Sequence, residues 1–250
     1  MKYSRIAAAA GLLLGLMGVA QAQPVKNIVL VHGAFVGGAG WRPVYDRLTH
    51  DGYHVTLVQE PLTSFAEDVK ATKRILDQQN GPAILVGHSY GGAIITEAGN
   101  DSHVAGLVYI AAHALDQGET EAINGKKYPN SAHPFAKSPD GFLTIAPENY
   151  HADFAADLPA ALAHFEAHAQ MPTSASVFTA NIPDPAWKTK PSWYMVAKAD
   201  KIINPDLERM YAKRAHSHTV EISGASHSVY ESHPREVAAL IEQAAQHALP

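Results

Sequence analysis

The segment from Gly87 to Gly92 constrains the fold most, because it places Ser89 between glycines directly after the apolar run Ala83–Val86. This pattern predicts a strand, a sharp turn and a helix that begins near Gly92. Glycines two positions on either side of Ser89 let the turn close without a Cβ collision, which holds the hydroxyl out at the strand's end. A tight Gly-Ser turn that only caps a helix is the alternative interpretation, so the rest of the chain must decide.

Short apolar runs alternate with helical patterns along the chain, which is typical of a mostly parallel sheet covered on both faces. The predicted strands are Asn27–Val31, His54–Val58, Ala83–Val86, Val104–Ile110, Ser192–Ala197 and His218–Ile222. The predicted helices between and after them include Trp41–His50, Ser64–Gln79, Leu207–Ala215 and Arg235–Ala248. We therefore expect an α/β fold whose sheet has about six strands.

One region breaks this alternation, because about 80 residues separate Ile110 from Ser192 where a crossover needs only a dozen or so. It contains a polar stretch with glycine and proline, Gly118–Gly141, and then an Ala- and Phe-rich helical stretch, Glu148–Gln170. We expect residues from about 113 to 190 to form a helical cap over Ser89, at the sheet edge where ligands of open α/β folds bind.

The N-terminal segment Met1–Ala22 has the pattern of a secretory signal peptide. Lys2 and Arg5 precede a short apolar core, and Ala20-Gln21-Ala22 matches an A-x-A cleavage site. The core of about 14 residues is shorter than the roughly 20 that a membrane span needs, although an uncleaved anchor is the alternative. The sequence therefore predicts an exported protein, periplasmic or secreted, with residues 23–250 as a single domain.

Charge and composition exclude several classes of function. The formal net charge is −5, and removal of the signal peptide would make it −7, so neither nucleic acid nor an anionic membrane surface is an expected partner. The chain has no cysteine, which excludes thiol catalysis and cysteine-ligated metal. Among the 15 histidines, His164 and His168 lie four residues apart, but Glu166 between them does not complete a zinc-protease motif. No metal site is predicted.

Two further polar residues follow predicted strands at the same sheet edge as Ser89. Asp200 comes after Ser192–Ala197, and His227 comes after His218–Ile222. The chain order Ser, Asp, His is the order of the catalytic triads of one hydrolase fold. Asp116 is an alternative acid, and Asp200 or His227 could instead have structural roles; the coincidence of all these placements favours a catalytic site.

A glycine-containing loop, His32–Gly38, follows the first strand. Its backbone can approach a substrate oxygen closely, so the backbone N–H groups of Ala34 and Tyr90 are predicted to form an oxyanion hole. His88 beside the serine, Phe35 in the loop, and Trp187 at the end of the insertion are the candidates for substrate contact.

With these motifs the sequence resembles the α/β-hydrolase superfamily, and within it the small capped esterases that include plant methyl-ester esterases, hydroxynitrile lyases and bacterial pyrethroid-type carboxylesterases. The resemblance implies Ser89 as nucleophile, His227 as base and Asp200 as orienting acid, with no cofactor. Hydroxynitrile lyases of this branch have threonine where this chain has Gly33, and lysine where it has Ser228.

The expected function is therefore hydrolysis of small to medium or aromatic carboxylic esters through an acyl-enzyme. A cofactor-free hydroxynitrile lyase or a perhydrolase would use the same triad, and a non-catalytic ligand-binding protein usually lacks one of its members. These remain the alternatives. The sequence specifies neither the ester nor the oligomeric state.

Overall fold

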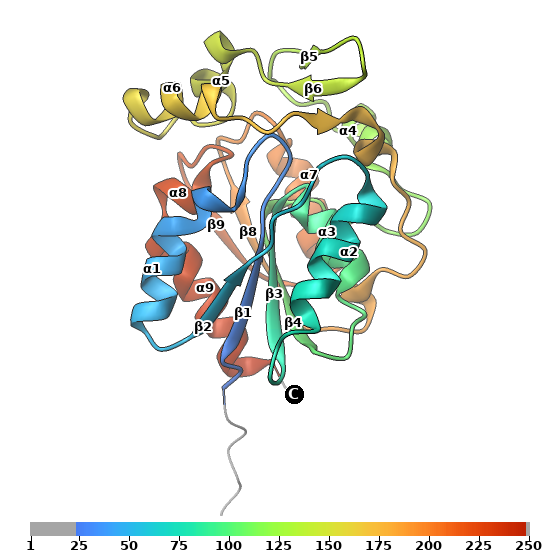
Figure 1. Cartoon of the computed structure of the whole chain (residues 1–250), viewed down its shortest axis with the longest axis vertical. Coiled ribbons are helices and arrows are strands. Elements are labelled where there is room, and N and C mark those ends of the chain that lie inside the picture. Colours follow the sequence, from blue (N-terminus) through green and yellow to red (C-terminus); the bar gives the residue numbers. More distant parts are fainter. Residues whose placement is uncertain (1–23, 249–250) are drawn as a thin grey trace, which may run out of the picture.

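The computed structural model describes residues 24–248, and the predicted signal peptide at Met1–Ala22 lies outside them. A six-stranded sheet in the order β2-β1-β3-β4-β8-β9 forms the centre (Figure 1). Its strands are β1 (Asn27–Val31), β2 (His54–Leu57), β3 (Ala83–Ser89), β4 (Val104–Ala112), β8 (Ser192–Ala197) and β9 (His218–Ile222). Every neighbouring pair is parallel. The predicted α/β fold is confirmed.

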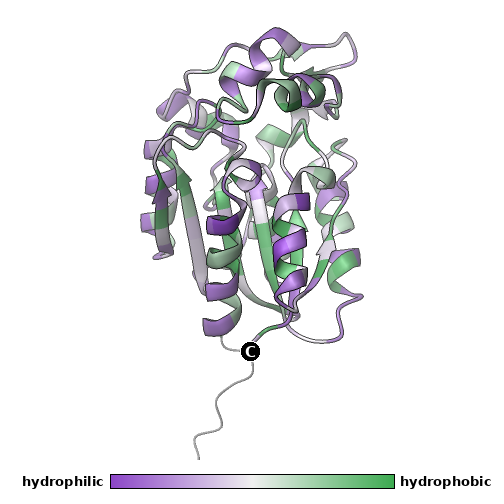
Figure 2. Cartoon of the chain, turned by 90° about the vertical axis from the view of Figure 1, so that its left-hand side faces the viewer, coloured by the Kyte–Doolittle hydropathy of each residue, from purple (hydrophilic) through white to green (hydrophobic). Residues whose placement is uncertain are grey.

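Helices cover both faces of this sheet because alternate strand residues point to opposite sides. In β3, Ile84 and Val86 join one apolar cluster, and Leu85 joins the other. The first face is covered by η1 (Gly38–Trp41), α1 (Arg42–His50), α8 (Val229–Ser232) and α9 (Pro234–His247), and the second by α2 (Phe65–Leu76), α3 (Gly91–Ala98) and α7 (Pro205–Arg214). Figure 2 shows hydrophobic strands between helices that carry hydrophilic residues.

The long connection from β4 to β8 lies over the carboxyl ends of the strands (Figure 1). It contains α4 (Glu121–Lys127), β5 (Ala136–Lys137), β6 (Phe142–Thr144), α5 (Pro147–Asp153), α6 (Ala160–His168), β7 (Thr173–Ser174), η2 (Ala175–Thr179) and η3 (Ala186–Lys188). Helices are present as expected. The three-stranded antiparallel sheet β5-β6-β7 was not predicted, because strands of two or three residues show no alternation in sequence.

Backbone hydrogen bonds attach this cap to the core beside Ser89. The N–H of Met171 donates to the carbonyl of Phe35 (2.9 Å), and the N–H of Ser174 donates to the carbonyl of Leu62 (2.8 Å). On the other side, Ser228 donates its N–H to the carbonyl of Phe154 (3.0 Å). The cap is thus fixed to the loops that carry the predicted site. Within residues 24–248, no helix combines the length and apolar composition needed to cross a bilayer.

Candidate active site

Ser89 lies at the turn between β3 and α3 with φ of +54°, a left-handed conformation that a non-glycine residue rarely adopts. Backbone segments pass so close to this turn that Gly87 and Gly91 have no room for a side chain. A Cβ atom added to Gly87 would lie 2.5 Å from the carbonyl oxygen of Gly91, and one added to Gly91 would lie 2.5 Å from that of His32. The glycines therefore permit the strained turn that presents the Ser89 hydroxyl.

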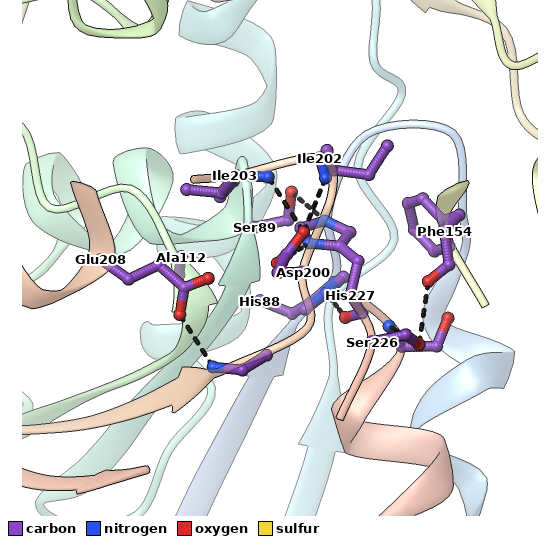
Figure 3. A network of polar contacts seen from close by, with 12 residues as sticks. His88, Ser89, Ala112, Phe154, Asp200, Ile202, Ile203, Glu208, Ser226 and His227 are labelled. Carbon is purple, nitrogen blue, oxygen red and sulfur yellow. Dashed lines mark hydrogen bonds and ion pairs between the residues drawn. The ribbon is translucent and has the colours of Figure 1, made fainter. Parts of the chain in front are cut away.

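A continuous series of hydrogen bonds joins the three residues predicted to act together (Figure 3). Ser89 Oγ lies 2.8 Å from His227 Nε2, and His227 Nδ1 lies 2.5 Å from Asp200 Oδ2. All three residues are buried. They come from the carboxyl ends of β3, β8 and β9, so the parallel sheet brings Ser89 to two side chains that lie more than a hundred residues further along the sequence.

Asp200 is held by backbone donors as well as by His227. Its Oδ1 accepts the N–H groups of Ile202 (2.7 Å) and Ile203 (3.0 Å), which fixes the carboxylate while Oδ2 faces the imidazole (Figure 3). The alternative acid, Asp116, forms an ion pair with Lys188 in the cap, at 2.5 Å. It is therefore engaged elsewhere, and Asp200 is the carboxylate at His227.

A second acid, Glu208 of α7, lies behind Asp200. Its side chain is buried and its Oε2 accepts the N–H of Ala197 at 3.0 Å. Burial and the neighbouring charge of Asp200 hold the pKa of Glu208 well above its usual value. This shift favours the protonated, uncharged form of Glu208 beside Asp200.

The loop after β1 lies against the serine. Ala34 and Phe35 line the same cavity as Ser89, and Phe35 has φ of +68°. The N–H of Phe35 donates to Thr173 Oγ1 at 3.0 Å, so it is occupied by a cap residue and is not an oxyanion donor. This leaves the N–H of Ala34 as the loop's candidate, as the sequence suggested.

The side chain of Tyr90 does not line the cavity at Ser89. Its ring is buried in the core, and its hydroxyl donates to Asp68 Oδ2 at 2.7 Å. Asp68 in turn accepts the N–H of Leu62 at 2.8 Å. The residue after a strand-to-helix turn begins the helix, so its side chain points into the helix–sheet layer while its backbone stays at the turn.

A cavity of about 250 Å³ opens at Ser89 beneath the cap. Most of its wall is apolar or aromatic, contributed by Ala34, Phe35, Ala122, Gly125, Tyr128, Phe135, Phe154, Phe178, Ile202, Ile203 and Leu207. The rings of Phe35 and Phe135 pack with centroids 4.8 Å apart, and Phe178 lies 6.1 Å from Phe35. Three phenylalanines, two of them from the cap, thus form a cluster on the cavity wall.

Two of the three predicted substrate contacts are not part of this wall. His88 is fully buried beneath the serine, where its Nε2 contacts the carbonyl oxygen of His227 at 2.9 Å and its ring packs on Tyr230. Trp187 donates its Nε1–H to the carbonyl of Leu115 at 2.9 Å. Alternation along β3 turns His88 away from Ser89, and η3 carries Trp187 to the side of the sheet. Of the three predicted residues, Phe35 alone lines the cavity.

His113 and Glu121 are polar cavity residues that the sequence reasoning missed. His113 follows β4 directly, and its N–H donates to the carbonyl of Ser89 at 3.1 Å. His113 Nε2 lies 3.2 Å from Glu121 Oε2. His113 could have been predicted as a cavity residue, because it directly follows a central strand. Glu121 lies in the insertion, where the sequence does not indicate which residues reach the cavity.

Among residues 24–248 there is no cluster of three or more His, Cys, Asp or Glu suited to a metal ion.

Comparisons with known proteins agree with the fold. The model of a family described as "Alpha/beta hydrolase family" matches residues 28–240. A pyrethroid hydrolase from Sphingobium faniae superposes with a TM-score of 0.73 at 23% identity, covering 89% of this chain and 98% of that one. An Arabidopsis methylesterase gives 0.73 at 19% identity, covering 88% and 98%.

Two further structures extend this set. Polyneuridine aldehyde esterase gives a TM-score of 0.73 at 17% identity, covering 88% of this chain and 98% of that one. Tomato methylketone synthase I, as a histidine variant, gives 0.74 at 16% identity, covering 90% and 99%. At these identities the likeness shows the fold. No curated protein sequence matches significantly. Because the family model spans most of the sequence and the fold agrees, the chain belongs to the alpha/beta hydrolase family.

Proposed function

We propose that this hydrolase is a serine carboxylesterase that cleaves small to medium or aromatic esters. The observation that carries the proposal is the hydrogen-bonded series Ser89–His227–Asp200 at the wall of an apolar cavity. A serine hydroxyl is a weak nucleophile near neutral pH, so a base within hydrogen-bond distance is the first requirement for acyl transfer. The contact of 2.8 Å between Ser89 and His227 supplies it.

In the proposed reaction, Ser89 Oγ attacks the ester carbonyl while His227 Nε2 removes the hydroxyl proton. Asp200 Oδ2 accepts the Nδ1–H of His227, which leaves Nε2 free to act as the base and stabilises the imidazolium that forms. The imidazolium then donates its proton to the leaving alcohol. Water, activated by the same imidazole, hydrolyses the acyl-enzyme and releases the acid.

The backbone N–H groups of Ala34 and Tyr90 are the proposed oxyanion donors. Ala34 lines the cavity with Ser89, and Tyr90 is the N-cap of α3, where N–H groups have no partner within the helix. Such donors stabilise charge that develops only in the tetrahedral intermediate, and therefore lower the barrier more than they strengthen substrate binding.

The lyase alternative is disfavoured by the space beside the serine. A Cβ atom at Gly33 would lie 2.8 Å from Ser89 Cβ and 3.1 Å from His88 Nδ1, so the threonine of the hydroxynitrile lyases does not fit without displacement of the nucleophile. Ser228, at the position of their lysine, is fully buried. Two structural neighbours are named as an esterase and a methylesterase, and a third is named as a hydrolase.

The test is a screen of p-nitrophenyl esters together with a cyanohydrin and with peroxide plus a carboxylic acid. We expect ester turnover by the wild type and a loss on the order of 10⁶ in kcat for Ser89→Ala. A fluorophosphonate probe should add one mass equivalent to the wild type and none to the variant. Ester turnover by Ser89→Ala within tenfold of the wild type would contradict the assignment, and cyanohydrin cleavage without ester cleavage would favour the lyase.

A further inference from the structure

The apolar cavity at Ser89 contains one buried acid whose second oxygen has no partner. Glu121 lines the cavity and is 7% exposed, and its Oε2 contacts His113 Nε2 at 3.2 Å. Its Oε1 is shielded from water and makes no hydrogen bond to any residue of the range 24–248. Buried polar atoms nearly always have a partner, so an orphaned carboxyl oxygen in a binding cavity points to a group supplied from outside.

The donors and acceptors in the polar network beside Glu121 can be assigned from the ion pair between Arg214 and Glu119. Arg214 binds both oxygens of Glu119, at 2.7 and 2.9 Å, and the pKa of Glu119 is lowered to about 2 by these hydrogen bonds. Glu119 is therefore ionised and can only accept, which orients Asn124 so that its Nδ2 faces Glu119 Oε2 at 3.0 Å. The same Nδ2 donates to Tyr211 Oη at 2.9 Å.

Because Tyr211 Oη accepts from Asn124, its own proton is available for His113 Nδ1, which lies 3.3 Å away. Nδ1 of His113 is then the acceptor nitrogen, and Nε2 carries the ring proton. Nε2 then faces Glu121 Oε2 at 3.2 Å with its proton. Burial lowers the pKa of His113 to about 3, so the ring is neutral and fits this tautomer. The network thus places a ring N–H beside Glu121 Oε2 and provides no partner for Oε1.

Glu121 is itself uncharged near neutral pH. Burial raises its pKa to about 8, because it disfavours the charged form. A neutral carboxyl group carries one O–H donor and one acceptor oxygen. Such a group can both donate to and accept from an uncharged hydroxyl.

We propose that Glu121, oriented by His113, is a specificity residue that binds a hydroxyl group of the ester within the otherwise apolar cavity. The inference rests on the proposed esterase function and deepens it, because it names hydroxyl-bearing esters, and aromatic ones in particular, as the substrate class. Aromatic rings of the substrate pack on the phenylalanine cluster of Phe35, Phe135 and Phe178, while the hydroxyl reaches the carboxyl group.

The experiment compares esters of matched shape. On the acyl side these are methyl 4-hydroxyphenylacetate and methyl 4-methylphenylacetate, and on the alcohol side 4-(hydroxymethyl)phenyl acetate and 4-ethylphenyl acetate. Products are quantified by chromatography. In the wild type, kcat/KM for the hydroxyl ester should exceed that for its methyl partner by about tenfold or more in at least one pair, as expected for one buried hydrogen bond.

The variants separate hydrogen bonding from shape. Glu121→Gln keeps both a donor and an acceptor and should retain the preference within about threefold, whereas Glu121→Leu should abolish it. Glu67→Gln, at an exposed glutamate of α2, is the matched control and should behave as the wild type. Circular dichroism and thermal melting of each variant check that it is folded.

The outcomes distinguish this inference from the function on which it rests. If none of these esters and no p-nitrophenyl ester is hydrolysed, the esterase assignment fails. If esters are hydrolysed but neither pair shows a hydroxyl preference, or the preference is equal in the wild type and Glu121→Leu, the assignment to Glu121 is overturned. If Glu121→Leu does not fold, the wild-type ratios of kcat/KM between the hydroxyl ester and its matched partner decide. A hydroxyl preference in either pair supports the inference, and its absence from both overturns it.

Discussion

Gly33 lies directly against Ser89, so that a Cβ atom added to Gly33 would come within 2.8 Å of Ser89 Cβ. That separation is shorter than real Cβ contacts, and neither group is the flexible end of a long side chain. The loop after β1 and the turn after β3 can therefore pack this closely only because residue 33 has no side chain. This contact sets the position of the serine relative to the Ala34 amide.

We expect Gly33→Ala to lower kcat/KM for a p-nitrophenyl ester by at least about 100-fold, because a shift of roughly 1 Å at the nucleophile can cost this much. Gly81→Ala is the matched control, since a Cβ atom there meets only Asn27 Nδ2, at 3.8 Å. Steady-state kinetics on both variants check the prediction. Equal activities would mean that the loop yields without moving Ser89.

Asp200→Asn should reduce kcat by roughly 10⁴. The asparagine can keep the amide hydrogen bonds of Ile202 and Ile203 through Oδ1, but its NH₂ would face His227 Nδ1 and select the wrong tautomer. Asp116→Asn should change kcat by only a few-fold, because Asp116 pairs with Lys188 instead. The two variants measured on one ester decide between the acids, and the reverse ranking would move the acid role to Asp116.

Stability should fall as pH rises toward 9, because of Glu231. Burial raises the pKa of this α8 residue to about 9, and Glu166 of cap helix α6 adds to the effect. Between about pH 4.5 and pH 9 the unfolded chain has lost this proton and the native state retains it, so unfolding releases a proton and becomes more favourable as pH increases. The loss is at most about 1.4 kcal/mol per pH unit for one proton.

Thermal unfolding of the wild type and Glu231→Gln across pH 5 to 9 measures this effect. The groups that interact with Glu231 are Glu166 and Tyr230, and neither acquires a compensating positive charge. The variant should gain in Tm relative to the wild type as pH rises. A difference in Tm that stays constant across the range would show that Glu231 ionises normally in the native state.

The cavity should favour short or aromatic acyl groups over long chains. Phe35, Phe135 and Phe178 close part of its wall, and its volume is about 250 Å³. In a series of p-nitrophenyl esters, kcat/KM should decrease at least about tenfold from the best short or aromatic ester to long acyl chains, because only substrates that fit beneath the cap exclude water. Phe178→Ala should shift the optimum toward longer chains. A rise toward long chains in the wild type would show that the cap opens.

Export is the prediction that concerns the segment outside the described residues. The basic start, short apolar core and Ala20-Gln21-Ala22 site predict cleavage so that the mature protein begins at Gln23. Cell fractionation and intact-mass analysis check this directly. Exported protein that retains Met1 would contradict cleavage, and recovery only from the cytoplasm would contradict export.

The sequence by itself determined the layered α/β fold and the residues at the strand ends. Apolar runs such as Ala83–Val86 are local signals, and their order along the chain limits the topology of a parallel sheet. Ser89, Asp200 and His227 could be predicted because each lies at the end of a strand or in the loop that follows one, and strands of a parallel sheet end at the same edge. Their convergence is thus a consequence of the fold class, and the structure has them hydrogen-bonded.

Only the tertiary structure decided which side chains face the substrate cavity. His88 and Tyr90 flank Ser89 in sequence yet point into the core, whereas Glu121 and Phe178, far away in the insertion, reach the cavity wall. The direction of a side chain at a sharp turn depends on the local backbone angles and on the layers packed around it. The path of an irregular cap depends on long-range contacts such as Met171 with Phe35. Neither leaves a periodic pattern in the sequence, so the residues of the cavity wall, unlike Ser89, could be identified only from the folded chain.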